Sequence, residues 1–296
     1  MRPLAWVRAS QAVLFEAAVV PACVGTAAAV AAGAPFNALH FALILVSLVA
    51  IQAGANLLKG YYEAQDRTVP PSSPGSWIAF DSGAAVGLTR DPRTVLRVAW
   101  TCMALGVLAG LALVALTGSV WLLLFGLAGF LLAWSYSSPP LKLSYRGIGE
   151  ISTFLAFGPI MTVGATLAFG TRGLVGSLLA SVILGFLAAA ISFSRYFPNE
   201  VEDRAKGKRT PVTLLGRQQS VSVLVALWWS PVCLALLWSS QDPRLLPALL
   251  PLPLLLAASA VLPGAQARTR ARSLAIGLTV LAHLFAGIGL LVAFLT

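Results

Sequence analysis

The first group of residues that could do chemistry reads N-L-L-K-G-Y-Y-E-A-Q-D-R, from Asn56 to Arg67. At 100° per residue, a helix would place Asn56, Gly60, Glu63 and Arg67 on one face. Asp66 would lie about 80° away from Asn56 by the same period. The spacing therefore predicts an amide, a carboxylate and a cation on one side of a helix.

A second group follows about 140 residues later and reads F-P-N-E-V-E-D-R-A-K-G-K-R-T, over residues 197–210. If this segment is helical, Asn199, Asp203 and Lys206 align, and Glu202 lies beside them. Carboxylate and amide oxygens are ligands of hard divalent cations, and Mg²⁺ commonly sits between one or two carboxylates and substrate phosphates.

Basic side chains accompany both groups and could donate to phosphate oxygens: Lys59, Arg67, Arg204, Lys206, Lys208 and Arg209. Metal ligands beside cations indicate a phosphorylated substrate. The alternative is two solvated loops with ion pairs four residues apart, such as Lys59 with Glu63.

A third stretch reads Y-S-S-P-P-L-K-L-S-Y-R-G-I-G-E, from Tyr136 to Glu150. Its prolines and glycines predict a defined loop, and Lys142 and Arg146 add positive charge. Tyr136 and Tyr145 could either line a cavity or anchor the chain at a membrane interface.

The elements that must position these groups are membrane helices. The chain of 296 residues is 58% hydrophobic and only 10% charged, too few charges to coat a soluble domain. Because a bilayer admits only helices or closed barrels, and no alternating pattern indicates barrel strands, we expect an all-α, polytopic membrane protein. The apolar runs predict nine spans, near 10–32, 38–64, 94–116, 119–135, 148–169, 173–197, 219–238, 244–263 and 273–295.

The positive charges predict the orientation. With nine spans, all but two of the 20 Lys and Arg residues fall on the side of the N-terminus. The positive-inside rule makes that side cytoplasmic and places the C-terminus outside. The net charge of +10 is spread over short loops, so anionic lipid headgroups explain it better than nucleic acid does.

Together the three stretches resemble the UbiA-type intramembrane prenyltransferases, most closely the branch that prenylates 1,4-dihydroxy-2-naphthoate in menaquinone biosynthesis. The segments from Tyr136 to Glu150 and from Arg204 to Gly216 carry this resemblance, and the order of motifs matches over nearly the whole chain. It implies a single domain over 1–296 with two pseudo-equivalent halves, roughly 1–135 and 136–296, around a central cavity. It also implies Mg²⁺, an isoprenyl diphosphate and an aromatic acceptor, and a location in the bacterial inner membrane.

The resemblance also suggests roles for individual residues. The catalytic residues would be Asn56, Glu63, Asn199 and Asp203, and the metal ligands Asn56, Glu63, Asp66, Asn199, Glu202 and Asp203. The diphosphate would be bound by Arg8, Lys59, Arg67, Lys142, Arg146 and Lys206.

Two positions depart from the family pattern. Gly60 stands where the first motif usually has Asp, and Asn199 where the second motif usually begins with Asp. A two-metal site is therefore not assured. Three alternatives stay open: another acceptor, such as a different quinone precursor, a tetrapyrrole or an internal cyclisation; a diverged member with little activity; or a carrier for an anionic lipid.

Overall fold

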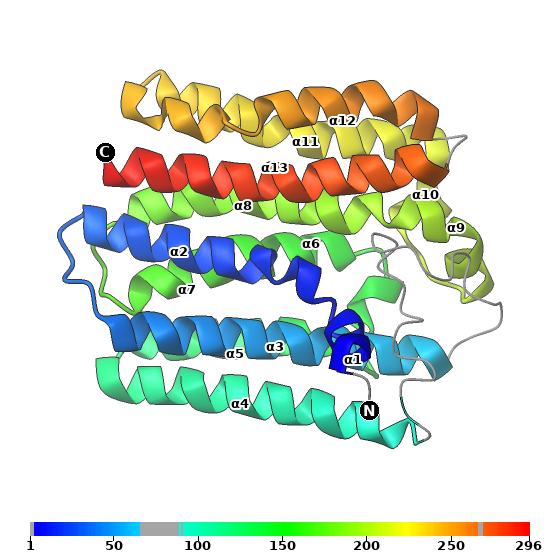
Figure 1. Ribbon diagram of the computed structural model, residues 1–296, viewed down its shortest axis with the longest axis horizontal. Coiled ribbons are helices and arrows are strands. Elements are labelled where there is room, and N and C mark those ends of the chain that lie inside the picture. Colours follow the sequence, from blue (N-terminus) through cyan, green and yellow to red (C-terminus); the bar gives the residue numbers. More distant parts are fainter. Residues whose placement is uncertain (1–2, 66–88, 90, 266–268) are drawn as a thin grey trace.

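The computed structural model describes residues 3–65, 89, 91–265 and 269–296, and these residues form helices and their connections without a β-strand. Long helices lie side by side along the length of the molecule (Figure 1). The helices preceding the Tyr136–Glu150 stretch are α1 (Pro3–Ala9), α2 (Glu16–Ala31), α3 (Ala38–Gln65), α4 (Arg93–Thr117) and α5 (Val120–Ser135). The later ones are α6 (Gly149–Leu155), α7 (Met161–Leu167), α8 (Leu174–Ser194), α9 (Tyr196–Ala205), α10 (Pro211–Leu215), α11 (Arg217–Ser239), α12 (Leu252–Ala265) and α13 (Thr269–Leu295).

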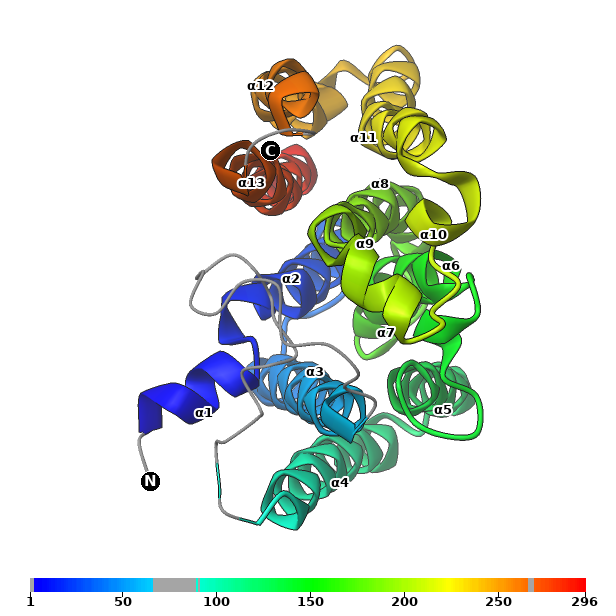
Figure 2. The ribbon, with the colours of Figure 1, turned by 90° about the vertical axis from the view of Figure 1, so that its right-hand side faces the viewer.

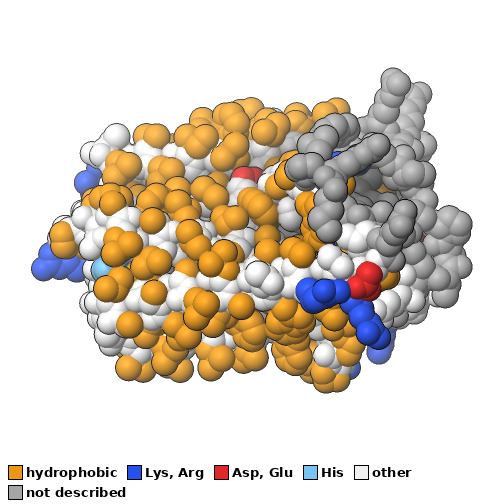
Figure 3. Space-filling view, turned by 60° about the horizontal axis from the view of Figure 1, so that its bottom comes forward, with side chains coloured by type: hydrophobic (Ala, Val, Ile, Leu, Met, Phe, Trp, Pro, Cys, Tyr) orange, Lys and Arg blue, Asp and Glu red, His pale blue; other side chains and the backbone are white. Residues whose placement is uncertain are grey.

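The predicted membrane fold is confirmed. Within the described chain, eight helical segments are long and apolar enough to cross a bilayer, and α5 is a shorter apolar helix of 16 residues. The predicted number of nine spans is therefore not confirmed. Hydrophobic side chains cover most of the visible flank, and the Lys and Arg side chains lie near its ends (Figure 3). Such a surface suits lipid, because hydrocarbon offers no partner to a charge.

Three predicted spans contain interruptions. Gln11 has a left-handed backbone, and a 3₁₀ turn over Ala12–Leu14 precedes α2. A π-helical segment over Ala156–Ile160 joins α6 to α7, and it contains Pro159, whose ring and missing N–H disturb regular α-helical bonding. Arg195 separates α8 from α9. Of these interruptions, the one at Arg195 comes directly before the helix that carries the second polar group.

The connections collect at the two ends of the bundle. α1, α9 and α10 lie at one end, to the right in Figure 1, which we call the polar end, and the last turn of α13 lies at the opposite end. Arg172 and Arg244 belong to connections far from the polar end. Among the described residues, the loop after α5 and the segment from α9 to α10 thus lie together at the polar end, as the charge pattern predicts.

The helices divide into a hollow part and a solid part. Seen from the polar end, α11, α12 and α13 lie together on one side of α2 and α8 (Figure 2). A continuous apolar core fills the space between these five helices. Trp228 is part of it: its ring is fully buried and its Nε1 donates to Thr279 Oγ1 at 3.1 Å. Trp228 is therefore a core residue and not a surface residue.

Candidate active site

The two polar groups meet at the polar end. Lys208 Nζ donates to Glu63 Oε1 at 2.6 Å and lies 3.3 Å from Asp203 Oδ1. Glu63 comes from the last turns of α3, and Asp203 from α9. All three side chains are at most 8% exposed. The carboxylates of two segments 140 residues apart thus converge around one cation.

These residues line a polar pocket. Its lining joins α3, α8, α9 and the residues that follow α5 and α9, and consists of Lys59, Glu63, Tyr136, Ser192, Arg195, Tyr196, Asn199, Glu202, Asp203 and Lys208. It contains acidic, basic and hydroxyl side chains. Such a mixture can hold an anion and the counter-ions of that anion together.

The end of α9 explains why Lys208 reaches the pocket. Gly207 has a left-handed backbone, its N–H donates to the Arg204 carbonyl, and the N–H of Lys208 donates to the Asp203 carbonyl. This pair of bonds is a Schellman helix end. Because the chain reverses there, Lys208 turns back over Asp203, whereas Lys206, directly after the last residue of α9, contacts Glu202 Oε1 at 2.5 Å.

The electrostatics of the pocket reflect burial and close charges. Burial alone would lower the pKa of Lys208, but Glu63 and Asp203 outweigh it and raise that pKa above its usual range. Burial raises the pKa of Asp203, and Lys208 opposes this shift. The ammonium of Lys208 therefore stays protonated at physiological pH.

The donor set fits one divalent cation shared with a ligand. Asp203 Oδ2 is buried without a hydrogen-bond partner among the described residues, and Glu63 and Asn199 line the same pocket. Mg²⁺ is commonly held by one or two carboxylates plus substrate phosphates. In the described chain, no group of three or more His, Cys, Asp and Glu could hold a metal on its own.

A large apolar cavity of about 490 Å³ lies beneath the polar pocket. Helices α2 to α8 surround it, and Phe125, Phe130 and Phe157 are among its aromatic walls. Four residues line both spaces: Lys59, Tyr136, Ser192 and Arg195. A ligand with an anionic head and an apolar tail would therefore place its head among the charges and its tail among the helices.

Hydroxyl groups cross-link the junction of the two spaces. Tyr136 Oη lies 3.2 Å from Ser192 Oγ. Tyr196 hydrogen-bonds to Glu150, and burial together with this neighbour raises the pKa of Tyr196. The Tyr145 ring lies beneath Lys208 Nζ at 4.7 Å. The loop after α5 thus packs against Lys208, the lysine that contacts Glu63 and Asp203. Of the two roles that the sequence left open for Tyr136, the structure supports cavity lining.

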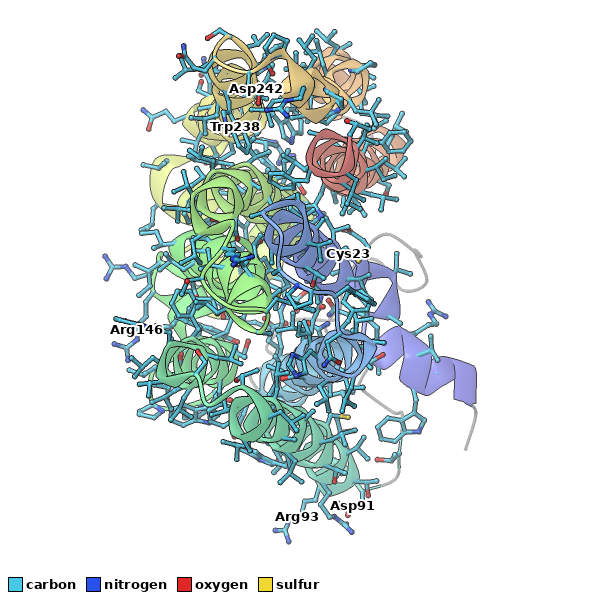
Figure 4. The ribbon with its side chains drawn as sticks, turned by 90° about the vertical axis from the view of Figure 1, so that its left-hand side faces the viewer. Cys23, Asp91, Arg93, Arg146, Trp238 and Asp242 are labelled. Atoms are coloured by element: carbon cyan, nitrogen blue, oxygen red, sulfur yellow. The ribbon has the colours of Figure 1, made fainter. Side chains whose placement is uncertain are left out.

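Several residues expected at the site lie elsewhere or in its periphery. Asn56 lines the apolar cavity, and its Nδ2 donates to the Ser10 carbonyl at 2.9 Å. Lys142 lies over the Tyr145 ring at 5.0 Å. Arg146 donates to the Pro140 carbonyl and extends outward from the bundle (Figure 4). Arg8 is exposed on α1.

Asp66 and Arg67 lie outside the described residues. Lys206 belongs to neither lining, and its Nζ is paired with Glu202. Ligand roles for these residues stay predictions.

Arg195 is a site residue that the sequence motifs do not single out. It lies between α8 and α9 and borders both spaces. A basic residue at the end of an apolar run is typical of the flank of a membrane span. Arg195 comes just before Tyr196 and the second polar group, and only this position could have indicated a role in the site.

Comparison with known protein families matches residues 18–284 to the family described as "UbiA prenyltransferase family". The chain belongs to this family. The match spans both polar groups and every helix that surrounds the cavity, so the resemblance expected from the three stretches is confirmed.

Curated relatives include a chloroplastic 2-carboxy-1,4-naphthoquinone phytyltransferase of Arabidopsis thaliana, 31% identical over 75% of this chain. The chain spans 57% of the length of that relative. A 1,4-dihydroxy-2-naphthoate octaprenyltransferase of Mycobacterium tuberculosis is 30% identical over 71% of this chain and 70% of its own.

Two solved structures share the fold. A UbiA homologue of Archaeoglobus fulgidus bound to GPP and Mg²⁺ has a TM-score of 0.66 at 16% identity, covering 97% of this chain and 99% of that one. The apo structure of a UbiA homologue from Aeropyrum pernix has a TM-score of 0.70 at 15% identity, covering 93% and 97%.

Proposed function

We propose that this UbiA-family protein transfers an isoprenyl group from a polyprenyl diphosphate to an aromatic acceptor of the 1,4-dihydroxy-2-naphthoate class. One observation carries the proposal: a charged pocket that joins both polar groups shares four lining residues with a large apolar cavity. The diphosphate head and the prenyl tail of such a donor match these two spaces. The names of the relatives support the naphthoate acceptor.

The charged residues would bind and stabilise the leaving diphosphate. Lys59 and Arg195 border both spaces, so they can donate to the phosphate oxygens nearest the prenyl carbon. Fixed donors aimed at developing negative charge lower a barrier without reorganisation. A bound Mg²⁺, held by Glu63 and Asp203 with Asn199 beside them, would neutralise the diphosphate as a Lewis acid.

The cavity would protect the reaction from water. The C–O bond of the donor breaks and its electron pair leaves with the diphosphate, so the allylic carbon becomes cationic. Aromatic faces such as Phe130 and Phe157 can stabilise a cation. The ring carbon that bears the carboxylate forms the new C–C bond, and loss of CO₂ returns the electron pair to the ring. Water would instead convert the cation to an alcohol.

The distribution of positive charges predicts where the protein lies and how it is oriented. We place the polar end on the cytoplasmic side of a bacterial inner membrane, with the N-terminus inside and the C-terminus outside, because the Lys and Arg residues concentrate there. A water-soluble naphthoate would then approach from the cytoplasm, while the prenyl donor stays in lipid.

A product assay tests the proposal. Purified protein in lipid nanodiscs is supplied with a polyprenyl diphosphate, Mg²⁺ and a panel of acceptors, with EDTA as the control. We expect a prenylated, decarboxylated naphthoate product that disappears with EDTA. A product only from another acceptor would correct the acceptor class. Diphosphate binding without any product would favour a carrier or a diverged, inactive member.

A further inference from the structure

Lys208 occupies the place between the two acidic groups that a bridging cation would take. Its ammonium contacts Glu63 from α3 at 2.6 Å and Asp203 from α9 at 3.3 Å. The same segment provides a second buried pair, Lys206 with Glu202. Each of the three carboxylates that line the polar pocket among the described residues is therefore bound by a lysine of this chain.

Two buried carboxylates facing each other need a cation. Without one, their mutual repulsion and lost hydration would disfavour the ionised pair. Lys208 supplies that charge from within the chain, so the pocket can stay assembled in the absence of any metal. The Tyr145 ring, 4.7 Å from the ammonium, adds a cation–π contact.

A divalent ion and this ammonium compete for the same two carboxylates, although Asp203 Oδ2 has no hydrogen-bond partner among the described residues. A Mg²⁺ ion needs oxygens at about 2.0–2.1 Å in a near-octahedral arrangement, and a neighbouring ammonium at hydrogen-bond distance would repel it. For the ion to bind Glu63 and Asp203, Lys208 must find another anion. A diphosphate among the same lining residues offers one.

We propose that Lys208 is a built-in competitor of the metal, so that Mg²⁺ alone binds weakly and binds well only together with a diphosphate. The inference rests on the diphosphate site of the proposed function and concerns how that site is loaded. Since coupling between two ligands is reciprocal, the diphosphate should also bind better when Mg²⁺ is present.

Substitution of the lysine tests this without turnover. In purified Lys208→Met, we expect a lower thermal unfolding midpoint than in the wild type, and Mg²⁺ alone should restore it. Equilibrium dialysis should show Mg²⁺ binding about tenfold tighter than in the wild type, within the usual range of ligand coupling. The wild-type midpoint should respond little to Mg²⁺ alone.

Lys206→Met is the matched control. It also removes a buried lysine from a carboxylate, but Glu202 is not bridged to a second acidic residue by Lys206. Mg²⁺ should therefore not restore its stability. Equal rescue of both variants, or no gain in Mg²⁺ affinity in Lys208→Met, would overturn the proposal.

A wild-type measurement covers the case in which Lys208→Met does not fold. Mg²⁺ affinity is measured with and without inorganic diphosphate, and we expect it to be about tenfold tighter with the anion. Equal affinity in both conditions would contradict the competition. Coupling without any prenylated product would overturn the proposed function alone, and product formation without coupling would overturn this inference alone.

Discussion

At the scale of single residues, the site is organised by charges that are already matched inside the protein. Glu63, Asp203 and Glu202 each have a lysine partner, whereas Lys59 and Arg195 lie where the polar pocket meets the cavity. A buried carboxylate that loses its charge cannot hold a cation, and a missing guanidinium cannot hold a phosphate. Substitutions of acidic and of basic residues should therefore separate binding of the cation from binding of the diphosphate.

Asp203→Asn should lower the turnover of the prenyl transfer by about a hundredfold, the size of effect seen when one preorganised electrostatic group is lost. The matched control is Glu200→Gln. Glu200 belongs to the same helix but pairs with Arg204 and Arg217 and does not line the pocket. Steady-state kinetics of both variants check the assignment, and equal losses would argue against a special role for Asp203.

Arg195→Gln should mainly weaken binding of the diphosphate donor. The loss of one charge-assisted hydrogen bond predicts a KM for the donor about tenfold higher or more, with a smaller change in the KM for the acceptor. Arg204→Gln serves as the control, because Arg204 is exposed and contacts Glu200. A donor KM unchanged in Arg195→Gln would remove this residue from the binding site.

At the scale of elements, the apolar runs predict most helices, but helical extrapolation fails where helices end. The period that aligns Asn199, Asp203 and Lys206 holds only to Ala205, the last residue of α9. Gly207 then reverses the chain and brings Lys208 into the pocket. The sequence identifies both acidic groups, but it cannot choose between lysines two residues apart, because that choice depends on the geometry of the turn.

Close packing of α3 against α4 positions the first polar group. A Cβ on Gly54 would lie 2.5 Å from Met103 Cγ and 2.9 Å from the Ala99 carbonyl oxygen, as expected where small residues let membrane helices approach. Gly54→Leu should destabilise the protein by about 2 kcal/mol, a usual cost of overpacking.

Thermal unfolding in detergent measures this change. Gly277→Ala in α13 is the control, since a Cβ there meets no atom within 4 Å. A Gly54→Leu midpoint as high as that of the control would show that α3 and α4 can separate at little cost.

At the scale of the whole molecule, the cavity lies among α2 to α8, while α11 to α13 form a solid core beside α2 and α8. Gly164 on α7 lines the cavity, twelve residues beyond Ser152 on the same kinked run of helix, or about 18 Å at the usual helical rise. A Cβ there would touch only Phe125, at 3.9 Å. A larger side chain would therefore project into the cavity, outside the lining of the polar pocket.

Gly164→Leu should shorten the accessible cavity and shift donor preference toward shorter prenyl diphosphates, because a long tail would lose part of its apolar burial. Competition between a short and a long donor, with both products quantified by mass spectrometry, reports the preference. Gly277→Leu, outside the cavity lining, should leave the product ratio unchanged. An unaltered ratio in Gly164→Leu would place the prenyl tail elsewhere.

The account depends above all on one pocket that brings the prenyl donor and a carboxylated aromatic ring together. Naphthoate labelled in its carboxyl group tests this directly through the release of labelled CO₂ by the purified protein. We predict release in step with diphosphate, and only when the polyprenyl diphosphate and Mg²⁺ are both present. Release without the donor, or diphosphate formation with the label retained on the ring, would contradict the account.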